Sequence, residues 1–581
     1  MSQRMRSRPS RRTVVAGALA ASGCATIGNG GGPGLDALIA DIARHPRAMR
    51  DGSDPYSDDD GALLPDNSYD YHVDSAARVR QWLASAHALR ARSADADAVE
   101  TIDALIWDLN CDAALAPYYW HPFPLAYANS QMARVTSALS SAAQAEEIDQ
   151  ASLLEAGRQA PGFIDNITLR LTTQIERNLT VPAAEAQRAL ETVRSARARL
   201  ATLGETLEQN EGGFARDLSA QLRGPIAASA ERLARYLEQS YLPAVDERSR
   251  LPLADDAHAY HAALINLRTS HAASPDEELA IAREDLARAE EDLARMRRSL
   301  GADPDMVRFH QALGRDPRWI ARDADDVQRR LDEASTRIAP YIPRLFHRMP
   351  SSPGSAAPLP DALSTTRLNG YYQEPTTEDP RGTYYFNTYQ LDTTSWMWAA
   401  PLIFHELSPG HHVQLATVFE STTLSHYRKS LWVPGYVEGW GEYARQLAEE
   451  CGVYEEDPWG LYASRLLERR FTLRSVEDLS VHDPAWTWQA SERRYATDPL
   501  TRPSTTVQLA LASSIMRSSG TPYWRGLKEF LALRAQAQSF RGAGFDIRDF
   551  HEVALSGGAL PFPVLEQRLR RYGLLAPRSE P

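Results

Sequence analysis

Apolar side chains recur every three or four positions along most of the first 350 residues, with charged residues between them. This spacing places the apolar residues on one face of a helix, so we expect helices there. The clearest stretches are Ala76–Leu89, Ala98–Leu109, Phe163–Arg177, Ala183–Glu208 and Ile226–Tyr241. No fixed-period repeat accompanies them, which argues against a solenoid. The pattern predicts a mainly α fold.

A further helix is predicted from Ser274, because Ser-Pro-Asp-Glu places a cap, a proline and acidic residues at a helix start. It runs to about Leu300, and Leu279, Leu286 and Leu293 recur in it every seven residues. The leucines could form a coiled-coil surface for a partner, or they could pack inside an α-domain. Three heptads fall short of a convincing coiled coil, which favours internal packing.

The pattern changes near residue 350. Pro350–Pro360 is rich in Ser, Pro and Ala, and we expect it to separate a helical region, 33–350, from a second region, 351–581. Thr383–Tyr389 is β-branched and aromatic, so it predicts a strand. That strand could lie at a sheet edge and pair with an extended substrate, or it could be interior.

Residues 1–32 have the features of an export signal rather than of a folded segment. Arginines precede a short apolar run, Val14–Ala21, that is too short to span a bilayer. Ala21-Ser22-Gly23-Cys24 resembles a lipobox, which would anchor the mature protein by a lipid on Cys24; simple cleavage nearby is the alternative. We expect an exported, periplasmic or cell-envelope lipoprotein. Cys111 and Cys451 remain after processing, either paired or as separate thiols.

Composition and net charge reduce the classes of possible binding partner. The 581 residues are 43% hydrophobic and 24% charged, which is typical of a globular protein with a large core. The net charge of −13 argues against nucleic acid and against anionic membrane surfaces as partners. Contact with a membrane is therefore expected only through the lipid anchor, and the oligomeric state stays open.

The segment from His405 to His412 packs three imidazoles and one carboxylate into eight positions. Zinc enzymes need this set: neutral imidazoles as ligands and a carboxylate, here Glu406, as a base. In H-E-x-x-H the two histidines share a helix face, but here Pro409 occupies that second position. An interruption at Ser408–Gly410 would bring either His411 or His412 back to His405, and the smaller distortion favours His411.

A second segment downstream offers a third ligand. Val437, Trp440, Ala444 and Leu447 recur at helical spacing, so this segment predicts a helix with one buried face. On its flank lie Glu438 and Glu442, one turn apart. Glu438 could bind zinc as the anionic ligand, and Glu442 could hold one of the ligands in position without binding the metal itself. A solvated pair of glutamates is the alternative.

These residues resemble the DUF885 family of bacterial proteins, whose pattern is H-E-x-x-P-G-H-H-x-Q followed by E-G-W. Gly382–Tyr389 and Phe550–Pro561 resemble two further family segments, and the similarity spans roughly residues 35–575. Arg445 departs from the family pattern, which has Glu there, and the family's P-G-Q segment is not recognisable after Arg494-Tyr495.

The resemblance implies a zinc metallopeptidase of the gluzincin type. It implies a helical fold in which a small sheet borders a deep active-site cleft walled by the N-terminal half. Glu406 would be the general base, with Tyr495 or His551 stabilising the oxyanion; His551 could instead be a core histidine. The implied substrate contacts come from four residues, namely Tyr384, Tyr385, Asn387 and Arg494. Arg494 could equally form a structural ion pair.

The expected function is therefore zinc-dependent hydrolysis of peptide bonds in short peptides. Two alternatives stay open: a zinc amidohydrolase acting on a non-peptide amide, and a non-catalytic exported lipoprotein that binds or scaffolds through a relict site. The carboxylate of Glu406 beside the histidines favours an enzyme, because a structural zinc needs no base.

Overall fold

The structure is a computed structural model that describes residues 33–45, 47, 63–126, 130–140, 142, 147–210, 212–245, 256–360, 370–501 and 505–577. The expected export signal, 1–32, and Cys24 lie outside the described residues. Helices dominate, with one three-stranded sheet, so the prediction of a mainly α fold with a small sheet is confirmed. Within the described residues, no helix has the length and apolar character needed to cross a membrane.

The chain divides into two compact units, which we describe separately. Unit 1 takes the described residues up to Tyr260 together with Ser514–Met516, and unit 2 takes the rest from His261. The division expected near 350 therefore falls inside unit 2. The reason is packing: the helices that follow His261 lie against those of the histidine segment.

Unit 1 is entirely helical in its described residues. Its elements are α2 (Pro33–Arg44), α3 (Tyr69–Arg92), α4 (Ala96–Leu115), η2 (Ala116–Tyr118), α5 (Gln131–Leu139), α6 (Glu147–Glu176), α7 (Ala183–Glu208), α8 (Gly213–Gln221), η4 (Leu222–Ile226), α9 (Ala227–Tyr236), η5 (Leu237–Tyr241) and α10 (Leu242–Ala244).

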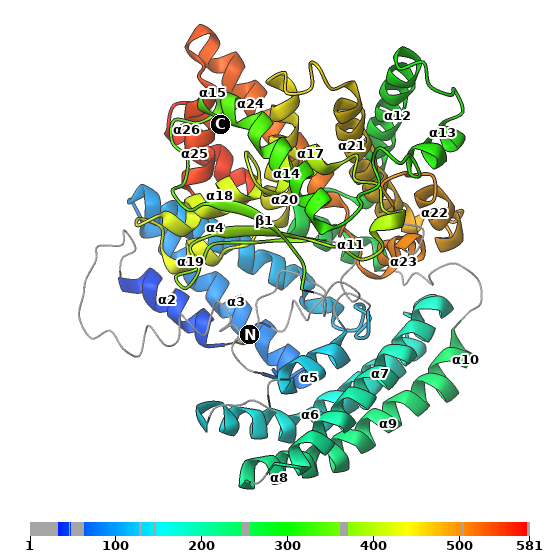
Figure 1. Ribbon diagram of the computed structural model, residues 1–581. Coiled ribbons are helices and arrows are strands. Elements are labelled where there is room, and N and C mark those ends of the chain that lie inside the picture. The colour runs from blue at the N-terminus through cyan, green and yellow to red at the C-terminus, as the bar shows by residue number, and fades with distance from the viewer. Residues whose placement is uncertain are drawn as a thin grey trace. The chain divides into compact units, whose positions relative to one another are not determined.

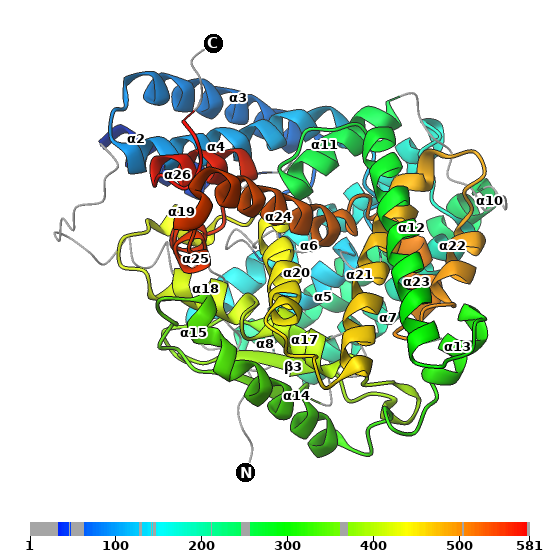
Figure 2. The same ribbon diagram turned by 90° about the horizontal axis from the view of Figure 1, so that it is seen from above.

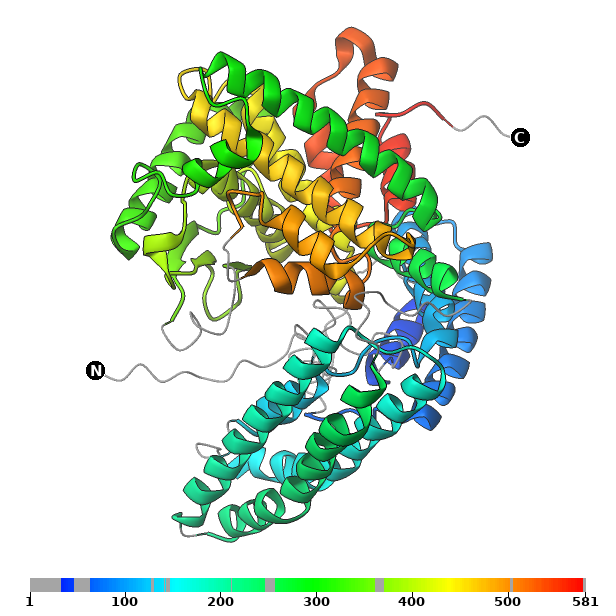
Figure 3. The same cartoon turned by 90° about the vertical axis from the view of Figure 1, so that its right-hand side faces the viewer.

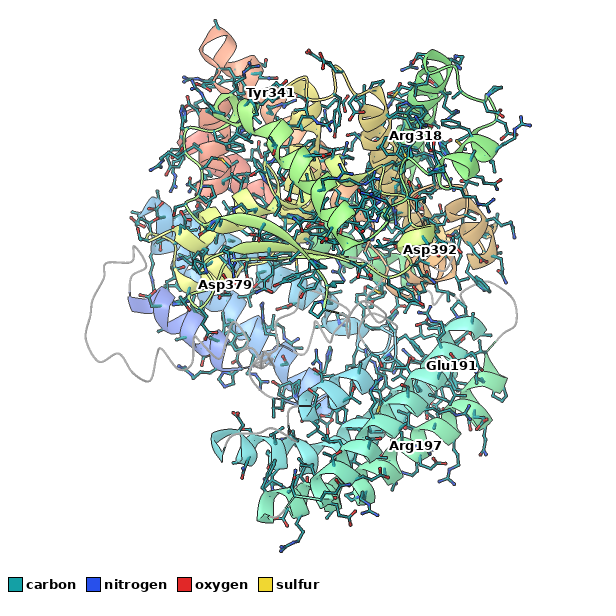
Figure 4. All side chains as sticks on the ribbon, in the orientation of Figure 1. Glu191, Arg197, Arg318, Tyr341, Asp379 and Asp392 are labelled. Carbon is teal, nitrogen blue, oxygen red and sulfur yellow. The ribbon has the colours of Figure 1, made fainter. Side chains whose placement is uncertain are left out.

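The long helices of unit 1 pack around one leucine- and alanine-rich core. Helices α6, α7 and α9 lie side by side, in the cyan to green ribbons of Figure 3. Their apolar faces meet at residues such as Ile164, Val193 and Leu233, which are fully buried. Glu191 and Arg197 lie on the exposed side of α7 (Figure 4). Each helix is thus amphipathic, as its sequence periodicity predicts.

Unit 2 holds the remaining elements. They are α11 (Ala257–Thr269, which begins in unit 1), α12 (Pro275–Ser299), α13 (Met306–Leu313), α14 (Ala324–Ile338), η6 (Ala339–Tyr341), α15 (Ile342–Leu345), β1 (Gly354–Pro358), β2 (Tyr371–Gln373), β3 (Gly382–Phe386), η7 (Leu391–Thr393), α17 (Ala399–Glu406), α18 (His411–Glu420), α19 (His426–Ser430), α20 (Pro434–Glu450), α21 (Pro458–Leu479), η8 (Ser480–His482), α22 (Trp488–Tyr495), α23 (Thr506–Ile515, which ends in unit 1), α24 (Thr521–Arg541), η10 (Gly542–Gly544), α25 (Ile547–Ser556) and α26 (Phe562–Arg571).

Helix α12 begins as predicted and packs inside unit 2. The Ser274 hydroxyl accepts from the Glu277 N–H while the Glu277 carboxylate accepts from the Ser274 N–H, which completes a capping box. Leu279 packs near Val476 and Trp524, and Leu293 packs near Tyr462. Two of the three heptad leucines thus lie in the core of unit 2, which favours internal packing.

The sheet has the order β1-β3-β2, with β1 parallel and β2 antiparallel to β3. The predicted strand is therefore the central one, which matches the interior alternative. The reason is β1, which pairs Gly354 with Gly382 from within the stretch predicted as a boundary. Helices α14 and α18 contact the sheet (Figure 1).

Helix α20 is the centre of unit 2. Every residue from Pro434 to Arg445 is buried, and the helix packs against α17, α21 and α24 (Figure 2). Because the helix is buried on all sides, the desolvation of each of its polar side chains must be compensated by a partner within the protein.

The two cysteines outside the export signal are separate thiols. Cys111 is buried in unit 1, and Cys451 is partly exposed at the C-terminal cap of α20 in unit 2. No disulfide joins these two described residues.

Candidate metal centre

The histidine segment folds as two short helices rather than as one interrupted helix. Helix α17 ends at Glu406 and α18 begins at His411, and the Ser408–Pro409 bond between them is cis. A Cβ on Gly410 would lie 1.8 Å from the carbonyl oxygen of His405, so only glycine fits this turn. The His405 and His411 rings meet edge-on, with centres 4.6 Å apart.

Three ligand atoms converge on one point. The Nε2 atom of His405 lies 3.6 Å from Glu438 Oε2, and the Nε2 atom of His411 lies 3.5 Å from the same oxygen. Tetrahedral zinc with bonds of about 2.1 Å places its ligands about 3.4 Å apart. These three buried residues therefore fit the spacing of a zinc site.

A glutamate on α20 orients the His405 ring through a hydrogen bond. The Nδ1–H of that ring donates to Glu442 Oε1 at 2.9 Å, because a carboxylate can only accept. This bond leaves the Nε2 lone pair facing the three-ligand point, the arrangement typical of metal-binding histidines. A Cβ on Gly441 would lie 2.6 Å from His405 Cε1, so glycine there admits the ring against the helix.

The departure from the family pattern at Arg445 has a role in this network. The buried Arg445 guanidinium donates to Glu442 Oε2 at 3.0 Å and to the Ser464 hydroxyl at 2.6 Å. It supplies the positive charge that a buried Glu442 requires, because an uncompensated buried carboxylate costs several kcal/mol.

The charges of the cluster favour a cation between the ligands. Burial alone would lower the pKa of His405, but Glu438 and Glu442 outweigh burial and raise the pKa to about 10. Burial would raise the pKa of Glu438, but the adjacent imidazoles of His405 and His411 hold it well below its usual range. Burial likewise opposes ionisation of Glu442, and the charge of Arg445 and the His405 hydrogen bond lower its pKa.

Glu406 lies beside the cluster without binding into it. Within the described residues, its carboxylate makes no hydrogen bond or ion pair, and its side chain is partly exposed. Burial raises its pKa, and the charges of His411 and His405 oppose that rise. A carboxylate next to the ligands with a raised pKa and no partner can both accept and return a proton.

His412, the other candidate second ligand, faces away from the cluster. Its Nε2–H donates to the Ser352 carbonyl oxygen at 2.9 Å, and its Nδ1 accepts from the Tyr372 hydroxyl at 2.9 Å. Both ring nitrogens are therefore engaged, and burial lowers the pKa of this imidazole. The structure brings His411, and not His412, to His405 and Glu438.

A further observation agrees with a metal between the ligand atoms of His405, His411 and Glu438. His411 Nδ1 is buried and has no hydrogen-bond partner among the described residues, so nothing there competes with a metal at Nε2 by fixing another orientation. The described residues also hold a second group, His347, Asp546 and Asp549, which is at least partly exposed. In that group His347 already bonds Asp549 and Asp546 already pairs with Arg548, so part of its set of ligand atoms is engaged by other residues.

Two predicted oxyanion donors are buried elsewhere in unit 2. The Nδ1–H of His551 donates to the Leu345 carbonyl oxygen at 2.8 Å, and its Nε2 accepts from the Tyr443 hydroxyl at 2.9 Å. Burial lowers the pKa of this imidazole to about 3. This geometry matches the core-histidine alternative. The Tyr495 hydroxyl lies 3.5 Å from Ser513 Oγ, and burial raises its pKa. The structure brings neither residue to the three-ligand point.

The four predicted substrate contacts also have other neighbours. Arg494 forms a two-point ion pair with the buried Glu477, which matches its structural alternative. Tyr384 is buried on the central strand, and the Tyr385 ring packs 5.3 Å from that of Tyr371. The Asn387 side chain accepts from the Tyr389 N–H at 2.7 Å, which shapes the turn after β3.

Three aromatic residues lie near the cluster, and the sequence reasoning missed two of them, Phe471 and Tyr523. Tyr372 bonds His412 and lies close enough to Glu406 that its pKa is raised by burial and then by that charge. The rings of Phe471 and Tyr523 lie 6.2 and 6.0 Å from that of His405. No local motif marks Phe471 or Tyr523, because only the packing of α21 and α24 brings them here.

Comparisons with known proteins place the fold. Two solved structures are similar: "the putative lipoprotein from Colwellia psychrerythraea" (TM-score 0.77, 18% identity, 93% of this chain and 99% of that chain) and "a putative lipoprotein of unknown function from Shewanella oneidensis" (TM-score 0.72, 16% identity, 92% and 99%). At these identities the likeness shows the fold alone. No curated protein matches the chain. The model of a family described as "Bacterial protein of unknown function (DUF885)" matches residues 48–569, and the chain therefore belongs to the DUF885 family.

Proposed function

We propose that this protein is a zinc-dependent peptidase that hydrolyses short peptides. The observation that carries the proposal is the convergence of His405 Nε2, His411 Nε2 and Glu438 Oε2 beside the unpartnered carboxylate of Glu406. Two imidazoles and one carboxylate with an adjacent glutamate form the ligand set and base of catalytic zinc sites. A structural zinc site would have no use for Glu406.

His405, His411 and Glu438 would hold the ion, and Glu442 would keep His405 in the tautomer that presents Nε2. A bound zinc ion supplies Lewis-acid chemistry, which activates water and polarises a carbonyl. Glu406 takes the proton of the attacking water and returns it to the leaving amine, so the amide bond breaks without releasing an amide anion. Tyr372, held by His412, keeps its proton and lies on the Glu406 side.

The choice of peptides over other amides stays part of this proposal. We also propose that the protein is exported and anchored by a lipid on Cys24. The arginine-rich start, the short apolar run and Cys24 support this, and the two solved structures above carry the name lipoprotein.

The histidine pair provides a matched test of the metal site. His411→Ala should reduce the zinc content from about one ion per chain to near zero, because it removes a ligand. His412→Ala should keep the zinc, because both nitrogens of His412 bond to protein atoms. Elemental analysis of the purified variants measures both. Zinc retained in His411→Ala and lost in His412→Ala would reverse the assignment.

Glu406→Gln should keep the zinc and the fold while lowering turnover by roughly 10²–10⁴-fold, the contribution typical of a general acid–base group. The measurement is cleavage of a short-peptide pool, with zinc measured on the same samples. Glu438→Gln is the matched control, since the same change at a ligand should lower the zinc content as well. Near-normal turnover by Glu406→Gln would contradict the mechanism.

Localisation is tested by Cys24→Ser in a bacterial host. The unchanged protein should fractionate with membranes, and the variant should be released, because one thiol carries the lipid. Immunoblots of membrane and soluble fractions, with mass spectrometry of the N-terminus, give the result. Wild-type protein that is soluble in the cytoplasm with residues 1–23 intact would refute export.

A further inference from the structure

The three histidines of the metal-binding segment differ in what holds their rings. His405 donates from Nδ1–H to Glu442 at 2.9 Å, and both ring nitrogens of His412 bond to protein atoms. The Nδ1 atom of His411 is buried and has no hydrogen-bond partner among the described residues. Histidines that bind a metal through one ring nitrogen almost always form a hydrogen bond through the other, which fixes the ring. His411 therefore needs a partner at Nδ1 to act as a ligand.

The backbone that carries His411 is already held in place. Helix α18 packs against α20 (Figure 2), and the Trp440 Nε1–H donates to the carbonyl oxygens of Pro409 at 3.1 Å and Gly410 at 3.2 Å. These bonds fix the start of α18, but they leave the His411 ring free to turn about its two side-chain torsions. A hydrogen bond at Nδ1 would remove that freedom and keep Nε2 directed at Glu438.

Gln414 is a fully buried amide with unmet hydrogen-bonding capacity. Its exposed fraction is 0%, and neither its Oε1 nor its Nε2 has a partner among the described residues. Its backbone N–H donates to the Gly410 carbonyl oxygen at 3.2 Å, so only the side chain is unsatisfied. Most buried side-chain polar atoms are hydrogen-bonded, and an exception usually marks a functional role or an ordered water or ion.

Gln414 and His411 lie on one face of α18. They are three residues apart in that helix, and residues at this spacing have their Cβ atoms about 5–6 Å apart. Helical side chains lean toward the preceding turn, and in α18 the turn before Gln414 carries His411. The two groups are also complementary, because the imidazole Nδ1–H is a donor and the amide oxygen is an acceptor.

The carboxylates of the cluster do not take this role. Glu442 accepts from the other ligand, His405, and Glu438 Oε2 lies 3.5 Å from the metal-facing nitrogen of His411, Nε2. Neither forms a hydrogen bond with His411 Nδ1. Gln414 thus supplies an acceptor on the same helix face without adding another buried negative charge.

We infer that Gln414 positions His411 for the metal, its amide oxygen accepting a hydrogen bond from the Nδ1–H of that imidazole. The bond forms by rotation of the buried amide or through one ordered water, and both routes leave Nε2 as the metal-binding atom. Gln414 therefore has the role for His411 that Glu442 has for His405. This inference rests on the proposed zinc site and makes Gln414 a positioning residue.

Zinc affinity gives the first readout, measured on the full-length protein by competition with a chelator. Gln414→Met keeps the length of the side chain but removes both polar atoms, so it should weaken zinc binding by roughly 10–100-fold. Gln414→Glu keeps an acceptor oxygen and should bind zinc at least as tightly as within about threefold of the unchanged protein. Gln328→Met is the matched control, because the Gln328 amide on α14 donates to Asp332 at 2.9 Å. It should leave the affinity unchanged.

Thermal unfolding of the metal-free proteins separates positioning from a purely structural role. Gln414→Met should unfold within about 4 °C of the unchanged protein, because it exchanges an unsatisfied buried amide for an apolar side chain of similar length. Crystals of the unchanged protein soaked with zinc provide the second readout. They should show Gln414 Oε1 hydrogen-bonded to His411 Nδ1, directly or through one water.

The outcomes separate this inference from the proposed metal site. Zinc bound equally tightly by the unchanged protein and by Gln414→Met would overturn the role of Gln414 and leave the metal site standing. No zinc binding by the unchanged protein would contradict the metal site itself, and this inference with it. Weaker zinc binding by Gln414→Met together with a large loss of thermal stability, not restored in Gln414→Glu, would show a structural role and overturn the positioning role.

Discussion

Glu438 and Glu442 lie one turn apart on a helix that is buried on all sides, and the surrounding side chains compensate for their charge. A buried carboxylate without a partner costs several kcal/mol, so α20 needs positive charge beside it. Glu442 has Arg445 and the His405 N–H. Glu438 Oε2 lies 3.5 and 3.6 Å from the Nε2 atoms of His411 and His405, and a cation between these three atoms would add to its compensation. The same constraint that makes α20 costly to bury makes it suitable for holding a metal.

The short distances around the His405 ring depend on the backbone at two glycines, Gly410 and Gly441, rather than on the side chains themselves. The turn between α17 and α18 reverses so tightly that Gly410 lies against the His405 carbonyl, which brings the two histidine rings together. Gly441 lets the same ring lie flat against α20. Replacing either glycine would push His405 away from Glu438 before any ligand were changed. The polar residues of the motif therefore act only because the small residues between them allow close approach.

The sequence alone was sufficient to predict those elements whose signals lie within a short stretch of residues. The periodicity of Val437, Trp440, Ala444 and Leu447 located α20, and the capping residues located the start of α12. Spacing favoured His411 over His412 as the histidine that faces Glu438 but did not decide between them, because the choice depends on how the turn at Pro409 directs α18. The orientation of His412 is set by Ser352 and Tyr372, which come from other parts of the chain.

Other features depend on long-range pairing, and the sequence alone left them open or did not show them. The central position of β3 comes from β1, whose Ser, Pro and Ala residues are typical of a linker. The division into units near Tyr260 follows from packing of α12 on α21 and α14 on α17, which no local composition reports. The contact of Arg445 with Ser464 and the stacking of Phe471 on Tyr523 were likewise not visible in the sequence, because each depends on a neighbour distant in sequence.

The most direct test of the metal centre is anomalous X-ray scattering at the zinc absorption edge, from crystals of the mature protein purified without chelators. We expect one strong peak about 2 Å from His405 Nε2, His411 Nε2 and a carboxylate oxygen of Glu438. Absence of a peak there in crystals soaked with zinc would contradict the proposal. So would a peak found only at His347, Asp546 and Asp549, the other group of ligand-type residues in the described part of the chain.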